Sequence, residues 1–598
     1  MKALFVSTIL VFLVTIAGIS QEVPVSDRDF NNSDATFRFA IVSDRTGGMR
    51  GGIFADAINK VEMLQPEFVL SVGDLIDGYT EDPEVWNAQW DEFDAIIENL
   101  SMPFYYVPGN HDTSNELLTE VWRARHGRDY YYFVYKDVLF LSLNTDEVNG
   151  GGISEEQVKY FEEVLGENEG VKWTLLFMHR PVWSYGERMG YDGIEEALGE
   201  RKYTLFSGHH HHYRYKVHNG MEHFTLATTG GGSWMRNPDV GELDHITWVT
   251  MQETGPEVAH IDINGIYGKD LVPEKDYEDI QVVRRGDWLQ VKPLVHESET
   301  FKRIPVTLTL TNNSKRFFNI SGELKDQHGI RFEPSSIKEW LEPDSTSKQI
   351  TIDAVSISGE SSIPDLNNSP LILEMNAGFE RELRNDISLS TSKVFFLDWK
   401  HQLKSASAPI TIDGDLSDWP KEDMIDVRNP QFIKEDWDWY GEEDGRFEFG
   451  VRYDKQNLYL AIKFYDETRH VNTSEILERQ DKFFIHLDKD LDPSEFEKIE
   501  LAIGSEADSP LINLDETSLK NLIAAIDGRS TIQMLEVAVP ISELLGDKKE
   551  ASEFIRINIG IMDHDRPENT KPSILWWRPV WGSDQDYENS GVFFLKED

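Results

Sequence analysis

Cysteine is absent from all 598 residues of the chain. Disulfide bonds and chemistry that depends on a cysteine thiolate, including that of the cysteine phosphatases, are therefore excluded. An exported protein without cysteine takes no stability from disulfides, which fits a bacterial periplasm or exterior better than a eukaryotic secretory route. Long apolar runs are also missing after residue 20, where no segment approaches the roughly 20 apolar residues that span a bilayer.

Positive charge is scarce. The 58 Lys and Arg residues are outnumbered by 107 Asp and Glu residues, which gives a formal net charge of −49. A surface this acidic excludes a general electrostatic footprint for nucleic acid. A phosphate-bearing substrate would have to be attracted by bound metals and by local arginines such as Arg45 and Arg180.

The N-terminus has the pattern of a signal peptide over residues 1–20. Lys2 precedes an almost wholly apolar stretch, 3–17, and small residues follow at 18–20. We expect a secreted or periplasmic protein, with an uncleaved anchor as the alternative. The chain is too long for one hydrophobic core, and its length predicts three or four domains.

Four consecutive histidines, His209–His212, follow the strand-like run 202–206. Histidine is the commonest metal ligand, and two imidazoles two residues apart at a strand end can reach one metal cluster. A polar surface turn is the alternative interpretation.

Further polar residues directly follow short apolar runs. These residues are Asp44 after 39–43, Asp74 after 68–72, Asn110 to Asp112 after 104–108, and His179 after 173–178. Short apolar runs bounded by turn residues predict buried strands. Open α/β sheets keep their sites at the carboxyl ends of such strands, so these side chains should converge on one rim. Mixed oxygen and imidazole ligands suit Mn, Fe or Zn better than Ca or Mg.

The ordered series of motifs resembles the calcineurin-like metallophosphoesterase superfamily over residues 36–268. The motifs are Gly73-Asp74-x-x-Asp77, Gly109-Asn110-His111-Asp112, the single His179, and Gly208-His209-x-His211. The resemblance implies an α/β four-layer sandwich that holds two divalent metal ions (Mn, Fe or Zn). It also implies hydrolysis of phosphate mono- or diesters through a metal-bridging hydroxide.

The resemblance implies ligands for both metals, with Asp74 as the bridging carboxylate. The other ligands would be Asp44 and His211 for the first metal, and Asn110, His179 and His209 for the second. His111 resembles the histidine that contacts the phosphate and protonates the leaving oxygen. Asp112 would then hold the His111 ring in one orientation. For Asp77 a turn or capping role is favoured.

One position departs from the family pattern. The family usually opens with Asp-x-His, whereas this chain has Asp44-Arg45-Thr46. Thr46 could bind weakly through its hydroxyl, and Arg45 could contact the substrate phosphate, since a guanidinium matches phosphate geometry. Compensation could also come from His210, His212 or His245. The alternative function is a non-catalytic or weakly active glycan- or surface-binding protein with a degenerate first metal site.

A triple glycine, 230–232, follows the strand-like run 222–229 and should border the site, with a plain flexible turn as the alternative. For His245 a supporting or core position is favoured over a ligand role.

Beyond residue 270 the pattern changes to short alternating strands, such as 306–313. Residues 275–395 predict an immunoglobulin-like β-sandwich with a spacer or interaction role. Residues 400–598 resemble family 9-like carbohydrate-binding modules, beginning with the motif 412–419 (IDGDLSDW). The expected fold class is therefore multidomain, a four-layer α/β metallophosphoesterase sandwich followed by two all-β sandwich domains.

The second resemblance implies that the C-terminal region binds a polysaccharide or other glycan. Aromatic faces stack on pyranose rings, and nearby carboxylates accept hydrogen bonds from hydroxyls. Candidate rings are Trp437, Trp439, Tyr440, Trp576, Trp577 and Trp581, unless they fill the core. For Asp413, Asp415 and Asp418, turn and capping roles are favoured over a calcium site.

Overall fold

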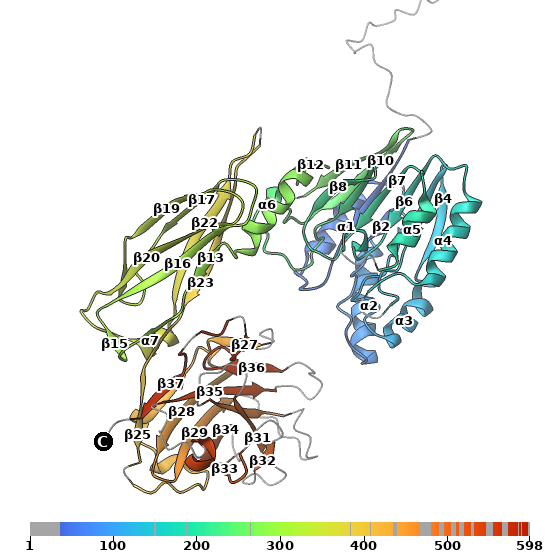
Figure 1. Ribbon diagram of the computed structural model, residues 1–598. Helices are drawn as coiled ribbons and strands as arrows, with labels where there is room; N and C mark the ends of the chain where they lie inside the picture. Colours follow the sequence, from blue (N-terminus) through green and yellow to red (C-terminus); the bar gives the residue numbers. More distant parts are fainter. Residues whose placement is uncertain are drawn as a thin grey trace, which may run out of the picture. The chain divides into compact units, whose positions relative to one another are not determined.

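The computed structural model describes residues 36–595 apart from 149–150, 186–188, 263–264, 383, 407, 435–438, 440, 467–479, 489–495, 504–509, 514–518, 528–530, 546–553, 565–571, 584 and 588. The expected signal peptide, 1–20, lies outside the described residues. The chain forms two compact units, Met1–Val272 and Pro273–Asp598 (Figure 1). Among the described helices, none combines the length and apolarity needed to cross a membrane.

The first sheet of the N-terminal unit has six strands: β1 (Phe37–Val42), β2 (Val69–Ser71), β3 (Phe104–Tyr105), β10 (Ile246–Gln252), β11 (Gly255–Ile261) and β12 (Ile266–Gly268). Their order is β12-β11-β10-β1-β2-β3. Strands β1, β2 and β3 run parallel, so their carboxyl ends lie at the same edge. Strand β10 is antiparallel to β1 and leads into β11 and β12.

The second sheet also has six strands: β4 (Tyr131–Tyr135), β5 (Val138–Ser142), β6 (Trp173–Phe177), β7 (Tyr203–Ser207), β8 (Arg214–His218) and β9 (Met221–Thr225). Their order is β4-β5-β6-β7-β9-β8, with β5, β6, β7 and β9 parallel. The strands predicted at 173–178 and 202–206 are thus confirmed as β6 and β7, and the structure pairs them side by side.

Phenylalanine rings join the two sheets face to face. The Phe39 ring lies 5.6 Å from Phe140 and 6.3 Å from Phe177, both rings of the second sheet. All three side chains are fully buried or nearly so, and each contributes roughly 1.5–3 kcal/mol of transfer free energy. The rims of the two sheets are held together by this shared core.

Helices cover the outer faces of both sheets: α1 (Ile53–Leu64), α2 (Pro83–Ile97), α3 (Glu116–His126), α4 (Glu155–Glu167) and α5 (Tyr191–Leu198). Helices α1 to α3 pack on the first sheet through Phe54, Trp90 and Trp122. Helices α4 and α5 pack on the second through Phe161 and Ile194. The order helix, sheet, sheet, helix is the expected four-layer sandwich (Figure 1).

The C-terminal unit begins with two four-stranded sheets. Its elements to residue 399 are α6 (Glu274–Arg285), β13 (Leu289–Val291), β14 (Leu294–His296), β15 (Thr300–Phe301), β16 (Arg303–Asn312), β17 (Phe318–Glu323), β18 (Ile330–Glu333), β19 (Ser336–Leu341), β20 (Thr346–Ser356), β21 (Ser361–Ser362), α7 (Ile363–Asn368), β22 (Leu371–Phe379), β23 (Ile387–Phe395) and β24 (Leu397–Trp399). The sheet orders are β13-β16-β20-β18 and β19-β17-β22-β23. Buried and exposed residues alternate along β16 and β22, as a half-buried strand requires.

The remaining elements build an all-β region: β25 (His401–Ser405), β26 (Met424–Val427), β27 (Phe432–Lys434), β28 (Gly445–Tyr453), β29 (Asn457–Asp466), β30 (Lys482–Asp488), β31 (Glu497–Ile503), β32 (Pro510–Asn513), β33 (Ile523–Asp527), β34 (Ile532–Pro540), α8 (Ile541–Leu545), β35 (Phe554–Asp563), β36 (Ser573–Trp576) and β37 (Val592–Leu595). Their main path is β32-β31-β30-β35-β37-β25-β28-β29-β34-β33. One apolar core, which includes Phe447, Ile485 and Ile559, unites the strands.

The candidate sugar-stacking rings of this region are mostly inside it. Trp576, Trp577 and Trp581 are buried, and the half-buried Trp439 donates its indole N–H to the Gly445 carbonyl at 3.1 Å. Trp437 and Tyr440 lie outside the described residues. For the three buried rings the alternative, that they fill the core of the sandwich or its rim, is therefore correct, with Trp577 in the apolar core itself.

The IDGDLSDW motif has the favoured turn roles. Asp413 and Asp415 accept hydrogen bonds from backbone N–H groups two residues ahead, and Asp418 accepts one from Thr411. The buried Glu536 carboxylate holds the motif by accepting from the Gly414 N–H and the Trp419 indole.

Candidate metal centre

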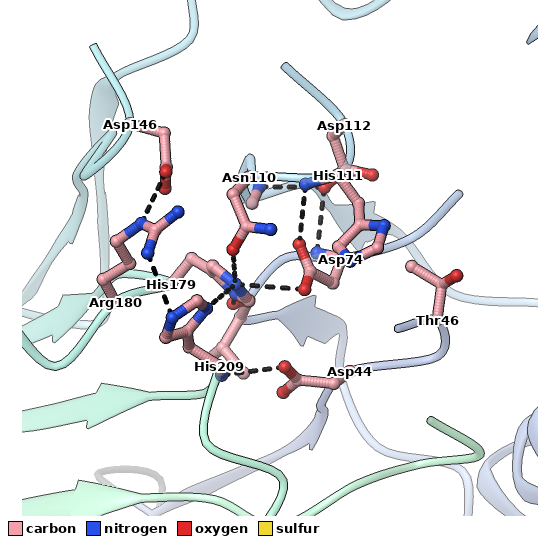
Figure 2. A network of polar contacts seen from close by, with 12 residues as sticks. Asp44, Thr46, Asp74, Asn110, His111, Asp112, Asp146, His179, Arg180 and His209 are labelled. Carbon is pink, nitrogen blue, oxygen red and sulfur yellow. Dashed lines mark hydrogen bonds and ion pairs between the residues drawn. The ribbon is translucent and has the colours of Figure 1, made fainter. Parts of the chain in front are cut away.

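The expected ligands meet where the carboxyl ends of the parallel strands of one sheet face those of the other (Figure 2). Asp44, Asp74 and Asn110 follow β1, β2 and β3 of the first sheet, while His179 and His209 follow β6 and β7 of the second. The predicted convergence is therefore present, but it joins the rims of two sheets and not one. Burial of the phenylalanine core between the sheets fixes the distance between these rims.

The first donor group contains Asp44, Asp74 and His211. One ligand atom from each lies within 4.8 Å of the others. His211 Nε2 is 3.4 Å from Asp44 Oδ1, and its Nδ1 is 2.6 Å from the Gly232 carbonyl. That carbonyl fixes the ring so that Nε2 points into the group, which is the usual arrangement of a metal-binding histidine.

The second donor group contains Asp74, His179 and His209, again within 4.8 Å. His179 Nε2 lies 3.1 Å from Asp74 Oδ2 and 3.1 Å from His209 Nδ1. The same nitrogen is 3.0 Å from Asn110 Oδ1. The Val72 carbonyl, 2.9 Å from His179 Nδ1, orients this ring from behind.

Asp74 belongs to both groups, so a single carboxylate connects them. The donors are carboxylate oxygens, an amide oxygen and imidazole nitrogens; Asp44, Asp74, Asn110 and His179 are buried, while His209 and His211 are half-buried. This mixture fits Mn, Fe or Zn, and the backbone partners of His179 and His211 leave one nitrogen of each ring free for a metal. The residues present therefore fit a pair of divalent cations.

Electrostatics of the cluster also favour a bound cation. Burial disfavours protonation of His179, but the charges of Asp74 and Asp44 outweigh burial and raise its pKa to about 10. Burial, followed by His179 and Arg180, lowers the pKa of His209 to about 3. Burial raises the pKa of Asp44, yet its interactions with His211 outweigh burial and hold it below the ordinary value. The carboxylates thus stay charged and draw positive charge to this rim.

Glycines let the chain pass close to these carboxylates. A Cβ on Gly109 would lie 2.2 Å from Asp74 Oδ1, and one on Gly208 would lie 2.4 Å from Asp44 Oδ2. Both contacts are impossible for a side chain, so the two positions require glycine. Asp74, His209 and His211 themselves have positive φ angles of 59°, 72° and 54°. Such strain is common where a site dictates the backbone.

His111 lies beside the cluster, and its ring is held by Asp77. His111 Nδ1 is 2.7 Å from the main-chain carbonyl of Asp77. The expectation that Asp112 orients this ring is wrong. The buried Asp112 carboxylate instead accepts hydrogen bonds of 2.8–3.1 Å from the backbone N–H groups of Asp74, Leu75, Ile76 and Gly109. These bonds fix the loops that carry Asp74 and Asn110.

Arg45 and Thr46 have other partners than those expected. The buried Arg45 guanidinium donates to the Leu75 carbonyl at 2.8 Å and to Glu92 at 2.7 Å, so it is directed into the α2 packing. We therefore do not propose Arg45 as a phosphate-binding residue. The Thr46 hydroxyl donates to the Asp77 carboxylate.

The other histidines weighed as substitutes lie outside both donor groups. His210 is 3.4 Å from the Tyr185 hydroxyl, and His212 Nδ1 is near the His210 carbonyl. His245 is a core residue, as favoured, and accepts the Ala227 N–H at 3.1 Å. The triple glycine does border the site, because the Gly231 N–H donates to the Asp44 carbonyl at 2.9 Å.

Two residues beside the cluster escaped the sequence interpretation. Tyr79, 63% exposed, accepts a hydrogen bond from the Asn110 amide at 3.1 Å, and its ring lies perpendicular to that of His111, with the centroids 4.9 Å apart. Asp146 binds Arg180 Nε at 2.6 Å, and Arg180 Nη1 lies 3.0 Å from His209 Nε2. Asp146 lies four residues after β5, which is the one signal that could have suggested it. Tyr79, Asn110, Asp146 and Arg180 line a cavity of about 610 Å³.

Comparisons with known proteins agree with this geometry. Residues 37–213 match the family model for calcineurin-like phosphoesterase. The probable glycerophosphodiester phosphodiesterase GpdQ of Arcobacter nitrofigilis is 28% identical over 182 residues, which cover 27% of this chain and 63% of the relative. The match thus spans less than two thirds of that protein.

Solved structures resemble separate parts of the chain. A dimetal phosphatase from Danio rerio is 16% identical and covers 38% of this chain and 98% of its own, with a TM-score of 0.29. A family 9 carbohydrate-binding module from Caldicellulosiruptor kristjanssonii in complex with cellotriose is 15% identical, covers 33% and 95%, and has a TM-score of 0.25.

Proposed function

Since residues 37–213 form a calcineurin-like phosphoesterase domain, we propose that this chain is a metal-dependent phosphoesterase that hydrolyses phosphate diesters. The observation that carries the proposal is the single carboxylate of Asp74 shared by two groups of metal-binding side chains. In the proposal, Asp44, Asp74 and His211 hold the first metal. Asp74, Asn110, His179 and His209 hold the second.

Two such metals would supply a water activated near neutral pH and neutralise the charge on the phosphoryl oxygens. His111 is the proposed general acid. Its Nδ1 is engaged with the Asp77 carbonyl, which leaves Nε2 to deliver a proton to the leaving oxygen. A Cβ on Gly47 would lie 3.4 Å from His111 Nε2 and 2.8 Å from the His211 ring, so Nε2 faces the first donor group across Gly47.

Arg180 is the proposed residue that positions the His209 ring, at the side of the second donor group that borders the cavity. Asp146 holds its Nε, and its Nη1 lies 3.0 Å from His209 Nε2, while His209 Nδ1 faces the cluster. The adjoining cavity of about 610 Å³ offers space for the second alcohol of a diester, which a monoester would leave empty. The named relative, a probable phosphodiesterase, supports the same preference.

A pair of chromogenic esters tests this proposal. Purified protein with Mn²⁺ should hydrolyse bis(p-nitrophenyl) phosphate with a higher kcat/KM than p-nitrophenyl phosphate. Hydrolysis of the monoester alone would contradict the diester preference. No hydrolysis of either ester, together with metal-free protein, would favour the second candidate, a non-catalytic binding protein whose first site is degenerate at Thr46.

The remaining parts of the proposal concern location and attachment. We propose export on the strength of the signal-like residues 1–20. We also propose glycan binding by residues 400–598, which is supported by the IDGDLSDW motif and the strands that follow it. Retention of the full chain on insoluble polysaccharide would test the second point.

A further inference from the structure

The C-terminal unit carries an exposed aromatic surface away from its C-terminal strands. Among its described residues, the aromatic side chains with the greatest exposure are Trp340 at 61% and Phe317 at 57%. Trp340 lies on β19 of the sheet β19-β17-β22-β23, and Phe317 directly precedes β17 of the same sheet. For this region the sequence suggested only a spacer or interaction role. A tryptophan this exposed on a regular strand has no packing function that explains it, and exposed aromatic patches commonly mark binding sites.

Trp340 begins a row that crosses the whole sheet. It pairs with Asn319 on β17, which pairs with Gly378 on β22, which pairs with Ser388 on β23. The polar members of this row are exposed, because the opposite face carries the buried alternating residues of the same strands. Strands about 4.8 Å apart make this row roughly 14 Å long.

The row is flat and uncharged. A Cβ on Gly378 would lie 1.8 Å from a main-chain carbonyl of β23, so close strand approach requires glycine there and no side chain interrupts the surface. The neighbouring row contains Ser321, Asn376 and Ser390, again amide and hydroxyl groups, and ends in Lys338 on β19.

A groove of about 420 Å³ runs over these rows and is lined by Trp340, Phe317, Asn319, Ser321 and Ser388. Among the described residues that line it, Arg316 is the one cation, and it is already paired with Asp276 and Asp279 on α6. The exposed carboxylates of Glu380 and Asp386 stand at the same end. The described lining therefore offers hydrogen-bond acceptors and an aromatic face but no free positive charge.

We propose that this groove binds a neutral glycan, with a pyranose ring stacked on Trp340. The electron-rich face of an indole attracts the weakly positive C–H groups of a sugar, while amides, hydroxyls and carboxylates bond its hydroxyls. An anionic glycan would meet the exposed carboxylates of Glu380 and Asp386. The exposed Lys338 lies in the neighbouring row and not among the residues that line the groove. A protein partner of ordinary chemistry would need a larger apolar core than two rings provide. This binding function is independent of the phosphoesterase proposal.

Affinity electrophoresis of the full chain through gels that contain neutral polysaccharides tests the proposal. The wild type should be retarded by at least one of them, and Trp340→Ala should weaken that retardation at least ten-fold. Trp340→Phe should retain most of the binding, because it keeps an aromatic face. Ile372→Ala, which alters an exposed apolar residue on β22 of the same sheet, should behave as the wild type.

Three outcomes would overturn the proposal. They are equal retardation of wild type and Trp340→Ala, binding only to anionic glycans, and no binding to any neutral glycan. Equal retardation of the two proteins would mean that the glycan binds elsewhere in the chain, for example at residues 400–598. Thermal unfolding of each variant shows that it is folded, and ester hydrolysis by the same preparations reports separately on the catalytic proposal.

Discussion

The hydroxyl of Thr46 donates a hydrogen bond to the carboxylate of Asp77. Thr46 stands where the family pattern places a histidine, and it is completely buried. The first donor group therefore contains Asp44, Asp74 and His211 without a second imidazole. Asp77 in turn offers its main-chain carbonyl to His111, so the departure at position 46 is linked through one residue to the proposed general acid.

Thr46→His should strengthen the first metal site. The added imidazole would complete the ligand shell. We therefore expect Mn²⁺ activation to saturate at a concentration lower by roughly ten-fold, which is the size of effect that a single substitution around a metal has on metal affinity. Activity measured against Mn²⁺ concentration checks this. Thr46→Ser, which keeps the hydroxyl for Asp77, is the matched control, and an unchanged curve for Thr46→His would mean that the shell is already complete.

His111→Asn should lower kcat by about 10²–10⁴-fold while leaving metal content unchanged. The asparagine amide can still donate to the Asp77 carbonyl but has no group in place of Nε2. A general acid matters most for a poor leaving group, so the loss should be larger for an alkyl ester than for a nitrophenyl ester. Equal losses on both esters would argue against proton delivery by His111.

Asp112→Ala should destabilise the N-terminal unit. The substitution leaves four backbone N–H groups without their buried acceptor, which costs roughly 3 kcal/mol or more. Calorimetric unfolding should show a lower midpoint, with Asp91→Asn on the surface of α2 as a neutral control. Wild-type stability with lost activity would instead restore a direct catalytic role for Asp112.

The C-terminal unit should lose stability in acid through His486. Burial, with a smaller effect of Lys498, lowers its pKa from 6.5 to about 3. The unfolded chain therefore binds a proton below pH 6.5 that the folded chain refuses down to about pH 3. Stability should fall across this window as pH falls, by about 1.4 kcal/mol per pH unit at most.

His486→Phe checks this, since the ring packs between Trp576 and Phe496 and a phenyl group can replace it. The drop in unfolding midpoint from pH 7 to pH 4 should be smaller in the variant than in the wild type. Equal drops would show that His486 is not the titrating group, because other acid-sensitive groups are common to both proteins.

The rim of the N-terminal unit could be predicted from sequence because each polar residue directly follows an apolar run that becomes a parallel strand. Asp44 and Asp74 are examples in the first sheet, and His179 is one in the second. Strand direction places each set at one rim, but only the packing of the two sheets against each other brings the rims together. Arg45 could not be placed this way, because its direction depends on Glu92 on α2, 47 residues away. Nor could Asp112, whose four partners are backbone groups of two loops.

Aromatic residues of the C-terminal unit show the same limit. Residue type alone does not distinguish Trp576 from Trp340. Their positions in the strands and the pairing of those strands decide that Trp576 is buried and Trp340 exposed. Alternation is readable in β19, where Ile337 and Leu341 flank the exposed positions. It fails in β36, whose residues are covered on both faces.

The metal content and diester hydrolysis of Asp74→Asn test the central claim most directly. The substituted amide would keep the shape of the side chain but would remove the charge that both donor groups share. We expect the wild type, isolated with Mn²⁺, to hold about two transition-metal ions per chain by elemental analysis. The variant should bind substantially fewer, lose at least roughly 10³-fold in kcat/KM on bis(p-nitrophenyl) phosphate, and unfold at a similar temperature. Wild-type metal content and hydrolysis in Asp74→Asn would contradict a two-metal site built on Asp74.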